Sequence, residues 1–181
     1  MQYVAALIGM MWVAHLGVTL ALVRRVRRLT GLIGPRPVLQ RPMILEEDET
    51  VGPFHAVTTA GRTVSRELLP EVGLAAFFSP ICPEAVERIP GFVATAGRFP
   101  GGTDAVLAVI VSEEPDAAEP YVRMLEPVAG VVVEPERGEL SRAFKTRGFP
   151  VFALLDATGR IMASGERLDQ IFEIPEESRT R

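Results

Sequence analysis

The side chain best suited to chemistry in this sequence is its single cysteine, Cys82. It follows the apolar run at 77–81 and precedes Pro83, a residue suited to the first turn of a helix. We therefore expect the Cys82 thiol at a helix N-terminus, where the peptide dipoles favour the nucleophilic thiolate. Redox pairs place a second cysteine three residues later, but that position is Ala85.

Alternating strand and helix patterns surround the cysteine. Short apolar runs typical of buried strands and the apolar periodicity of helices follow one another along the chain. We expect strands at 54–58, 63–65, 74–78, 105–111, 131–133, 151–155 and 160–164, and helices from 83, over 119–125 and over 139–145. The last two strands flank a turn at 156–159 and predict an antiparallel hairpin. This order predicts an α/β layer structure with a largely parallel centre.

Several motifs in this order resemble a known fold. Cys82 opens a helix after a buried strand, Pro90 lies inside that helix, and Gly148-Phe149-Pro150 precedes the closing hairpin with its Asp-x-x-Gly-x-Ile turn at 156–161. Together they resemble the thioredoxin fold, in particular the membrane-anchored TlpA/ResA/MauD-like thiol–disulfide oxidoreductases. The resemblance covers roughly 52–165 and implies a thioredoxin-like three-layer α/β sandwich with a mixed central sheet.

The resemblance also implies a site around the Cys82 sulfur. In this family the proline that matches Pro150 is cis and faces the sulfur, and the backbone of Phe149 presents an edge to a bound peptide. Ser79 and Pro83, which flank the cysteine, complete the expected substrate-binding residues. The alternative is that Pro150 only starts a strand. We expect no metal and no other cofactor, since two histidines and one cysteine lie far apart and no phosphate-binding loop occurs.

The alanine at position 85 leaves three hypotheses for function. In the first, Cys82 forms a mixed disulfide with a protein or low-molecular-weight thiol, and an external thiol resolves it. In the second, the protein is a one-cysteine peroxidase: Ser79 matches part of the peroxiredoxin motif, although Ala75 stands in place of its proline, and Arg142 or Arg147 would supply the arginine. In the third, the domain binds a partner without catalysis.

The N-terminal segment predicts a membrane anchor. Residues 1–23 contain no charged side chain, and four arginines follow within 24–28. By the positive-inside rule the main domain lies in the cytoplasm, whereas the relatives commonly work outside it. We expect a single-pass membrane protein with an anchor (1–23), a basic and then acidic linker with prolines (24–52), the thioredoxin-like domain (53–166) and a polar tail (167–181). The net charge of −4 gives no indication of a nucleic-acid partner.

Overall fold

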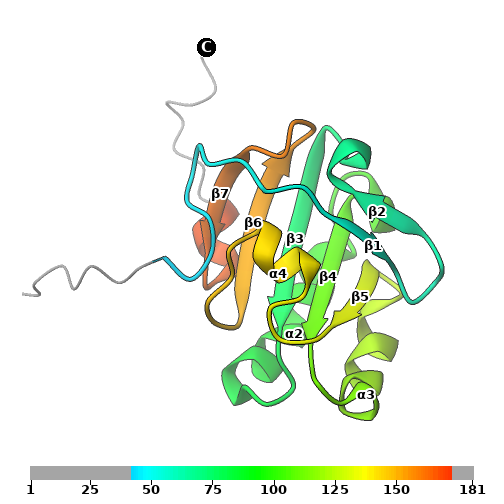
Figure 1. The fold of residues 1–181 in the computed structure, drawn as a ribbon. Coiled ribbons are helices and arrows are strands. Elements are labelled where there is room, and N and C mark those ends of the chain that lie inside the picture. Colours follow the sequence, from blue (N-terminus) through cyan, green and yellow to red (C-terminus); the bar gives the residue numbers. More distant parts are fainter. Residues whose placement is uncertain (1–41, 173–181) are drawn as a thin grey trace, which may run out of the picture. The chain divides into compact units, whose positions relative to one another are not determined.

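The computed structural model of the chain describes residues 42–172, which form a central sheet with helices on both faces (Figure 1). The sheet contains five strands: β3 (Val72–Phe78), β4 (Val106–Val111), β5 (Gly130–Glu134), β6 (Val151–Asp156) and β7 (Ile161–Gly165). The α-helices are α2 (Pro83–Ala96), α3 (Pro115–Leu125), α4 (Glu139–Ala143) and α5 (Leu168–Phe172). A separate hairpin of β1 (His55–Val57) and β2 (Thr63–Ser65) precedes the sheet, and two 3-10 turns, η1 (Arg66–Leu68) and η2 (Gly102–Asp104), complete the elements.

The strand order of the sheet is β5-β4-β3-β6-β7. Strands β3, β4 and β5 pair in parallel, whereas β6 pairs antiparallel with both β3 and β7. The prediction of a mixed sheet closed by a hairpin is thereby confirmed. Because parallel strands end at the same edge of a sheet, the segments that follow β3, β4 and β5 all begin at one end of the domain. Those segments lead into α2, α3 and α4.

The two faces of β3 support two cores. Leu74, Ala76 and Phe78 pack on the face covered by α2, α3 and α5, while Ala75 and Phe77 pack on the face covered by α4. This full burial on both faces explains why β3 reads as a continuous apolar run rather than an alternating one. On the α2 face the ring of Phe78 meets those of Phe92 and Phe152, with centroids 5.3 Å and 5.8 Å away.

The folded body begins before the predicted boundary at Pro53. Ile44, Leu45 and Val51 fall within the predicted linker, yet their side chains are buried in the core on the α4 face. Their backbone is also held, since the Leu45 N–H donates to the Phe144 carbonyl at 3.1 Å. The apolar residues among the acidic and proline residues of this stretch therefore belong to the domain.

Two further boundaries differ from the sequence prediction. Helix α3 begins at Pro115 rather than at residue 119, because a proline is accommodated at the first helical position, and the helix continues through Pro120. At the other end, the folded body extends past the expected boundary at residue 166 through α5, whose Ile171 packs in the core, as its apolar side chain within the otherwise polar tail suggests.

The predicted transmembrane segment, 1–23, lies outside the described residues. Within residues 42–172, none of the helices is long and apolar enough to cross a membrane.

Candidate active site

Cys82 occupies the junction between the central strand β3 and helix α2. Its backbone is extended, with φ −101° and ψ 106°, and it is the N-cap residue of α2, with Pro83 at the start of the helix. A turn leads into the helix, since the Cys82 N–H donates to the Ser79 carbonyl and the Cys82 carbonyl accepts from Val86, both at 3.1 Å. The half-buried thiol is thus held at the end of the domain where the parallel strands terminate.

The Phe149–Pro150 segment meets the cysteine from a distant part of the chain. The Cys82 thiol donates a hydrogen bond to the Phe149 carbonyl oxygen, with Sγ and O 3.3 Å apart across 67 residues of sequence. The peptide bond between Phe149 and Pro150 is cis, the geometry that the family resemblance implied. Pro150 itself is buried and directly precedes β6.

An open groove of about 610 Å³ passes over the thiol. Cys82, Pro83 and Phe149 line it together with Ile81, whose side chain is 91% exposed. A highly exposed isoleucine offers a large apolar contact, and here it lies in the same groove as the Cys82 sulfur. The groove therefore offers a partner an apolar contact next to the atom that can react.

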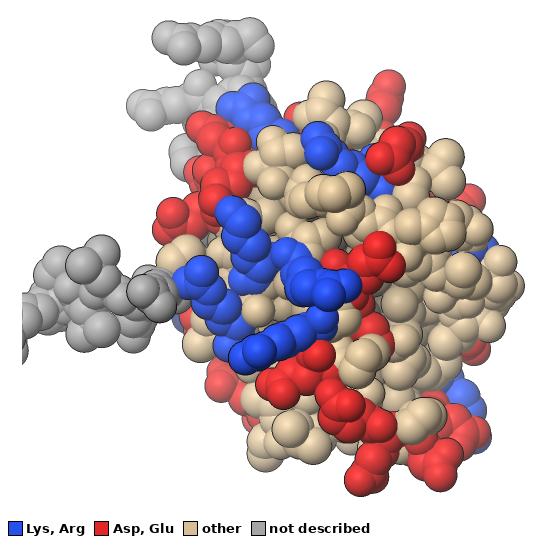
Figure 2. All heavy atoms as spheres, viewed as in Figure 1, with Lys and Arg blue, Asp and Glu red and all other residues tan. Residues whose placement is uncertain are grey.

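Charged side chains complete the groove. Glu113 and Glu114, before α3, and Glu136, before α4, line it opposite a single cation, Arg147. Within residues 42–172 none of the three carboxylates forms an ion pair. We call these three glutamates the acidic rim. Figure 2 shows acidic side chains gathered toward the end of the domain that carries α2 and α3, with basic side chains above them over α4.

The position of a resolving cysteine is closed to the groove. Ala85 follows Cys82 in the first turn of α2, and it is fully buried, with its methyl group in the same core as Ile89 and Phe92. Within residues 42–172 there is consequently one thiol and no second sulfur with which it could form a disulfide.

The structure brings together most of the site residues expected from the sequence. Cys82, Pro83, Ser79 and Phe149 all line the groove, whereas Pro150 lies buried behind it. The Ser79 hydroxyl is engaged elsewhere: it is buried and donates to the Val111 carbonyl at 3.1 Å, which ties the end of β3 to the end of β4.

Of the two arginines considered for a peroxidase, Arg147 lines the groove and Arg142 is not among the groove residues that the structure describes. The same part of the chain contains no cluster of three acidic, histidine or cysteine side chains that could hold a metal ion.

Sequence reasoning missed the acidic rim. The signal was present, because Glu113 and Glu114 follow directly after an expected strand that runs parallel to the strand before Cys82. In open α/β sheets, the residues just beyond the carboxyl ends of neighbouring parallel strands line the same crevice. Glu136 follows the third such strand, so all three glutamates could have been placed near the thiol.

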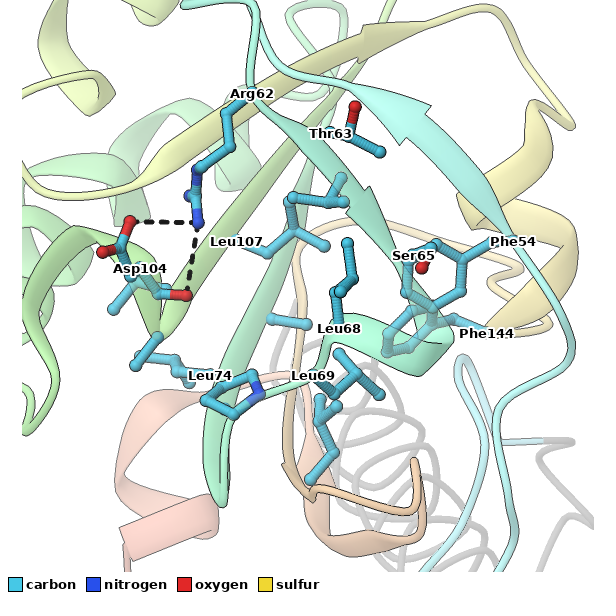
Figure 3. Close-up of a pocket in the computed structure, with 17 residues that line it drawn as sticks. Phe54, Arg62, Thr63, Ser65, Leu68, Leu69, Leu74, Asp104, Leu107 and Phe144 are labelled. Atoms are coloured by element: carbon cyan, nitrogen blue, oxygen red, sulfur yellow. Dashed lines mark hydrogen bonds and ion pairs between the residues drawn. The ribbon is translucent and has the colours of Figure 1, made fainter.

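A second, smaller cavity lies away from the thiol. It measures about 50 Å³ and lies between η1 and the starts of β3 and β4, with Leu68, Leu69 and Leu74 in its lining (Figure 3). At its edge Arg62 pairs with Asp104, with Nη1 and Oδ1 3.1 Å apart. The cavity is small and mostly apolar and its lining has no thiol, so the groove at Cys82 is the better candidate for chemistry.

Comparisons with solved structures agree with the fold and with the resemblance. The thioredoxin domain of a thiol-disulfide oxidoreductase from Bacteroides vulgatus is 17% identical, with a TM-score of 0.58, over 71% of this chain and 94% of that one. A candidate thioredoxin from Neisseria meningitidis is 27% identical, with a TM-score of 0.53, over 67% and 83% of the two chains. StoA from Bacillus subtilis is 19% identical, with a TM-score of 0.51, over 64% and 87%.

No family model and no curated protein matches the chain. The class defined by the fold is nevertheless clear: the protein has the thioredoxin-like α/β fold with a mixed central sheet. The solved structures that it resembles include the domain of a thiol-disulfide oxidoreductase.

Proposed function

We propose that this protein is a membrane-anchored, one-cysteine thiol–disulfide oxidoreductase that forms mixed disulfides through Cys82. The observation that carries the proposal is the placement of the thiol. It lies at the start of α2, in an open groove, with its sulfur 3.3 Å from the Phe149 carbonyl oxygen. Because Ala85 supplies no second thiol, the cycle depends on a thiol from another molecule.

The proposed cycle has two exchange steps. The Cys82 thiolate attacks one sulfur of a partner disulfide, which forms a Cys82–partner disulfide and releases the other sulfur as a thiolate. An external thiolate then attacks the partner sulfur of this mixed disulfide, which forms a new disulfide and returns Cys82 as a thiolate. The net reaction exchanges one sulfur of the partner disulfide for the external thiol, and Cys82 ends unchanged. A second external thiol, which attacks the new disulfide, completes the two-electron reduction of the partner disulfide to two thiols.

The test compares native and unfolded chains. The full-length protein in non-ionic detergent is mixed with a neutral disulfide, 2-hydroxyethyl disulfide, and the adduct on Cys82 is followed by intact mass. We expect the native thiol to react faster than the same thiol in urea, and added 2-mercaptoethanol to restore the free protein. Cys82→Ser is the matched control and should form no adduct. A native thiol that reacts more slowly than the unfolded one would favour the non-catalytic binding module instead.

The same readout by intact mass, with hydrogen peroxide in place of the disulfide, addresses the peroxidase alternative. Arg147, which lines the groove beside Cys82, is the one observation that favours it. Against it, the Ser79 hydroxyl donates to the Val111 carbonyl within the core. Rapid conversion of the thiol to a sulfenate by hydrogen peroxide, lost in Cys82→Ser and in Arg147→Gln, would select the peroxidase.

The anchoring part of the proposal is supported by the sequence of 1–23 and by the arginines that follow it. We expect the arginines to retain the domain in the cytoplasm. A C-terminal reporter fusion that is active in one compartment only tests this directly, and activity outside the cytoplasm would overturn the expected orientation.

A further inference from the structure

The acidic rim carries an inference about which partners the groove accepts. This inference rests on the proposed thiol–disulfide exchange at Cys82. We propose that the groove selects cationic disulfides: a cysteine-bearing peptide segment with lysine or arginine beside its disulfide, whose positive side chains face the three glutamates of the rim.

The placement of the carboxylates supports this selectivity. Glu113 is oriented by the fold, since its Oε1 accepts a hydrogen bond from the Glu136 backbone N–H at 2.8 Å. This bond ties the β4–α3 connection to the β5–α4 connection, and it brings two members of the rim together. Glu114 is the N-cap residue of α3, where the Ser112 hydroxyl bonds its backbone at 2.8 Å and 3.2 Å. Hydrogen bonds thus hold the Glu113 carboxylate and the backbones of Glu114 and Glu136 at the groove.

One cation, Arg147, lines the groove together with the three glutamates of the acidic rim. The charge of Arg147 also acts on Glu49, whose pKa is lowered chiefly by a backbone hydrogen bond at Glu46, with Lys145 and Arg147 adding to the effect. Three carboxylates against one guanidinium leave the groove with a negative balance. The other basic side chains seen over α4 in Figure 2 lie outside the groove lining.

A peptide is the occupant that fits the remaining surface. The exposed Ile81 side chain offers an apolar contact, and the Phe149 backbone lies beside the sulfur along the groove. A cationic residue next to the reacting disulfide is then attracted by the carboxylates of the acidic rim, whereas an acidic residue in the same place is repelled by them. Complementary charge of this kind raises association rates and suppresses wrong partners.

The test uses three small symmetric disulfides that differ mainly in charge: cystamine, 2-hydroxyethyl disulfide and 3,3′-dithiodipropionate. Each reacts with the full-length chain in non-ionic detergent, and each rate is divided by its rate with 2-mercaptoethanol to remove intrinsic reactivity. At low salt we expect the normalised rate for cystamine to exceed that for the neutral probe roughly tenfold, and the dianion to react slowest. High salt should reduce the spread. A disulfide peptide flanked by lysines should likewise react faster than one flanked by glutamates.

Charge-neutral variants assign the effect to the rim. Glu114→Gln with Glu136→Gln should remove most of the preference for cystamine. Glu71→Gln with Glu126→Gln makes the same change in net charge on exposed residues outside the groove, and it should leave the preference intact. If the three probes react at equal normalised rates in the unmodified chain, the selectivity is wrong while exchange at Cys82 stands. If none forms an adduct, the proposed function itself fails.

Discussion

The Sγ atom of Cys82 lies 3.3 Å from the Phe149 carbonyl oxygen, across a groove that opens to solvent. One helical turn along α2, Ala85 is enclosed in the core. The backbone around the sulfur belongs to a thioredoxin-like fold, and residues 42–172 contain no second thiol that could release a partner bound to Cys82. The proposed exchange at Cys82 therefore depends on a second thiol from another molecule.

Restoring the second thiol should restore self-release. In Ala85→Cys, a mixed disulfide on Cys82 is attacked by the new thiolate, which forms an internal disulfide and expels the partner as a thiolate. We expect the adduct with 2-hydroxyethyl disulfide to disappear without external thiol, and the intact mass to fall by two hydrogens. Filling the core at this position costs about 1–3 kcal/mol of stability.

Ala85→Ser is the matched control for this variant, because it adds one heavy atom at the same buried position and cannot form a disulfide. Its adduct should persist as in the unmodified chain. An adduct of equal lifetime in Ala85→Cys and Ala85→Ser would contradict the prediction.

Glu134 should be one of the most sensitive polar positions in the domain. Its buried carboxylate accepts from the Leu140 N–H at 2.9 Å, from the Ser141 N–H at 2.7 Å and from the Ser141 hydroxyl at 2.6 Å. Glu134→Ala leaves these donors at the start of α4 without partners, and we expect a loss of about 2–4 kcal/mol in the free energy of unfolding. Urea unfolding followed by circular dichroism measures the change. Glu139→Ala, on the exposed side of the same helix, should lose less than about 1 kcal/mol.

Gly138 should be coupled to the same carboxylate. A Cβ atom at Gly138 would overlap the carboxyl group of Glu134, so Gly138→Ala should destabilise the domain by about 1–3 kcal/mol. Glu134→Ala removes the carboxyl atoms from this clash and leaves the Glu134 Cβ, 2.7 Å from the added Cβ. Because most of the clash is relieved, the double variant should be more stable than the sum of the two single changes predicts. Simple additivity in the unfolding experiment would show that the two residues do not interact.

The turn between β6 and β7 should confer a pH dependence on stability. The pKa of Asp156 is lowered from its ordinary value near 3.8, chiefly because the Thr158 hydroxyl donates to its carboxylate, with the backbone N–H groups of Arg160 and Thr158 adding to the effect. A carboxyl with a lowered folded-state pKa stabilises the fold above its unfolded pKa, and this contribution is lost as the pH falls through the folded value.

We therefore expect Asp156→Ala to lose about 1 kcal/mol at neutral pH, a modest value because the group is partly exposed. Thermal unfolding at a series of pH values measures the difference between this variant and the unmodified chain. The difference should shrink below about pH 4. A difference that stays constant down to strongly acidic pH would show that the carboxylate charge is not involved.

The aromatic contacts beneath α2 should control how firmly that helix is held. Phe152 of β6 is fully buried, and its ring lies 5.8 Å from that of Phe78 and 6.1 Å from that of Phe92. Phe152→Ala should lower the free energy of unfolding by about 3–5 kcal/mol, whereas Phe172→Ala, at a ring that is 43% exposed, should have a much smaller effect. Equal losses in the two variants would contradict this packing.

The elements closest to the thiol were the most predictable from the sequence. Strand β3 and the start of α2 follow from a fully apolar run that ends at a cysteine and a proline, and each signal is local. The contact between Cys82 and Phe149 spans 67 residues, and it was accessible only because the family resemblance supplied the pairing. Local patterns alone would have placed the two residues in separate elements.

The missed features depend on tertiary contacts that local patterns do not report. Leu45 lies beside an acidic run typical of a solvated linker, yet it is buried because the chain crosses the α4 face at that point. Glu134 ends an apolar strand, and its role depends on a helix start that comes five residues later. The start of α3 at Pro115 was missed because the apolar periodicity becomes visible only further along that helix.

The acidic rim also bears on how the chain treats its own copies. A disulfide between the Cys82 residues of two molecules would bring two sets of Glu113, Glu114 and Glu136 face to face, and like charges at such distances repel. If the rim selects cationic partners as proposed, the same three glutamates also disfavour a disulfide between the Cys82 residues of two copies. Such repulsion between two copies would leave the thiol of Cys82 free for exchange with other molecules.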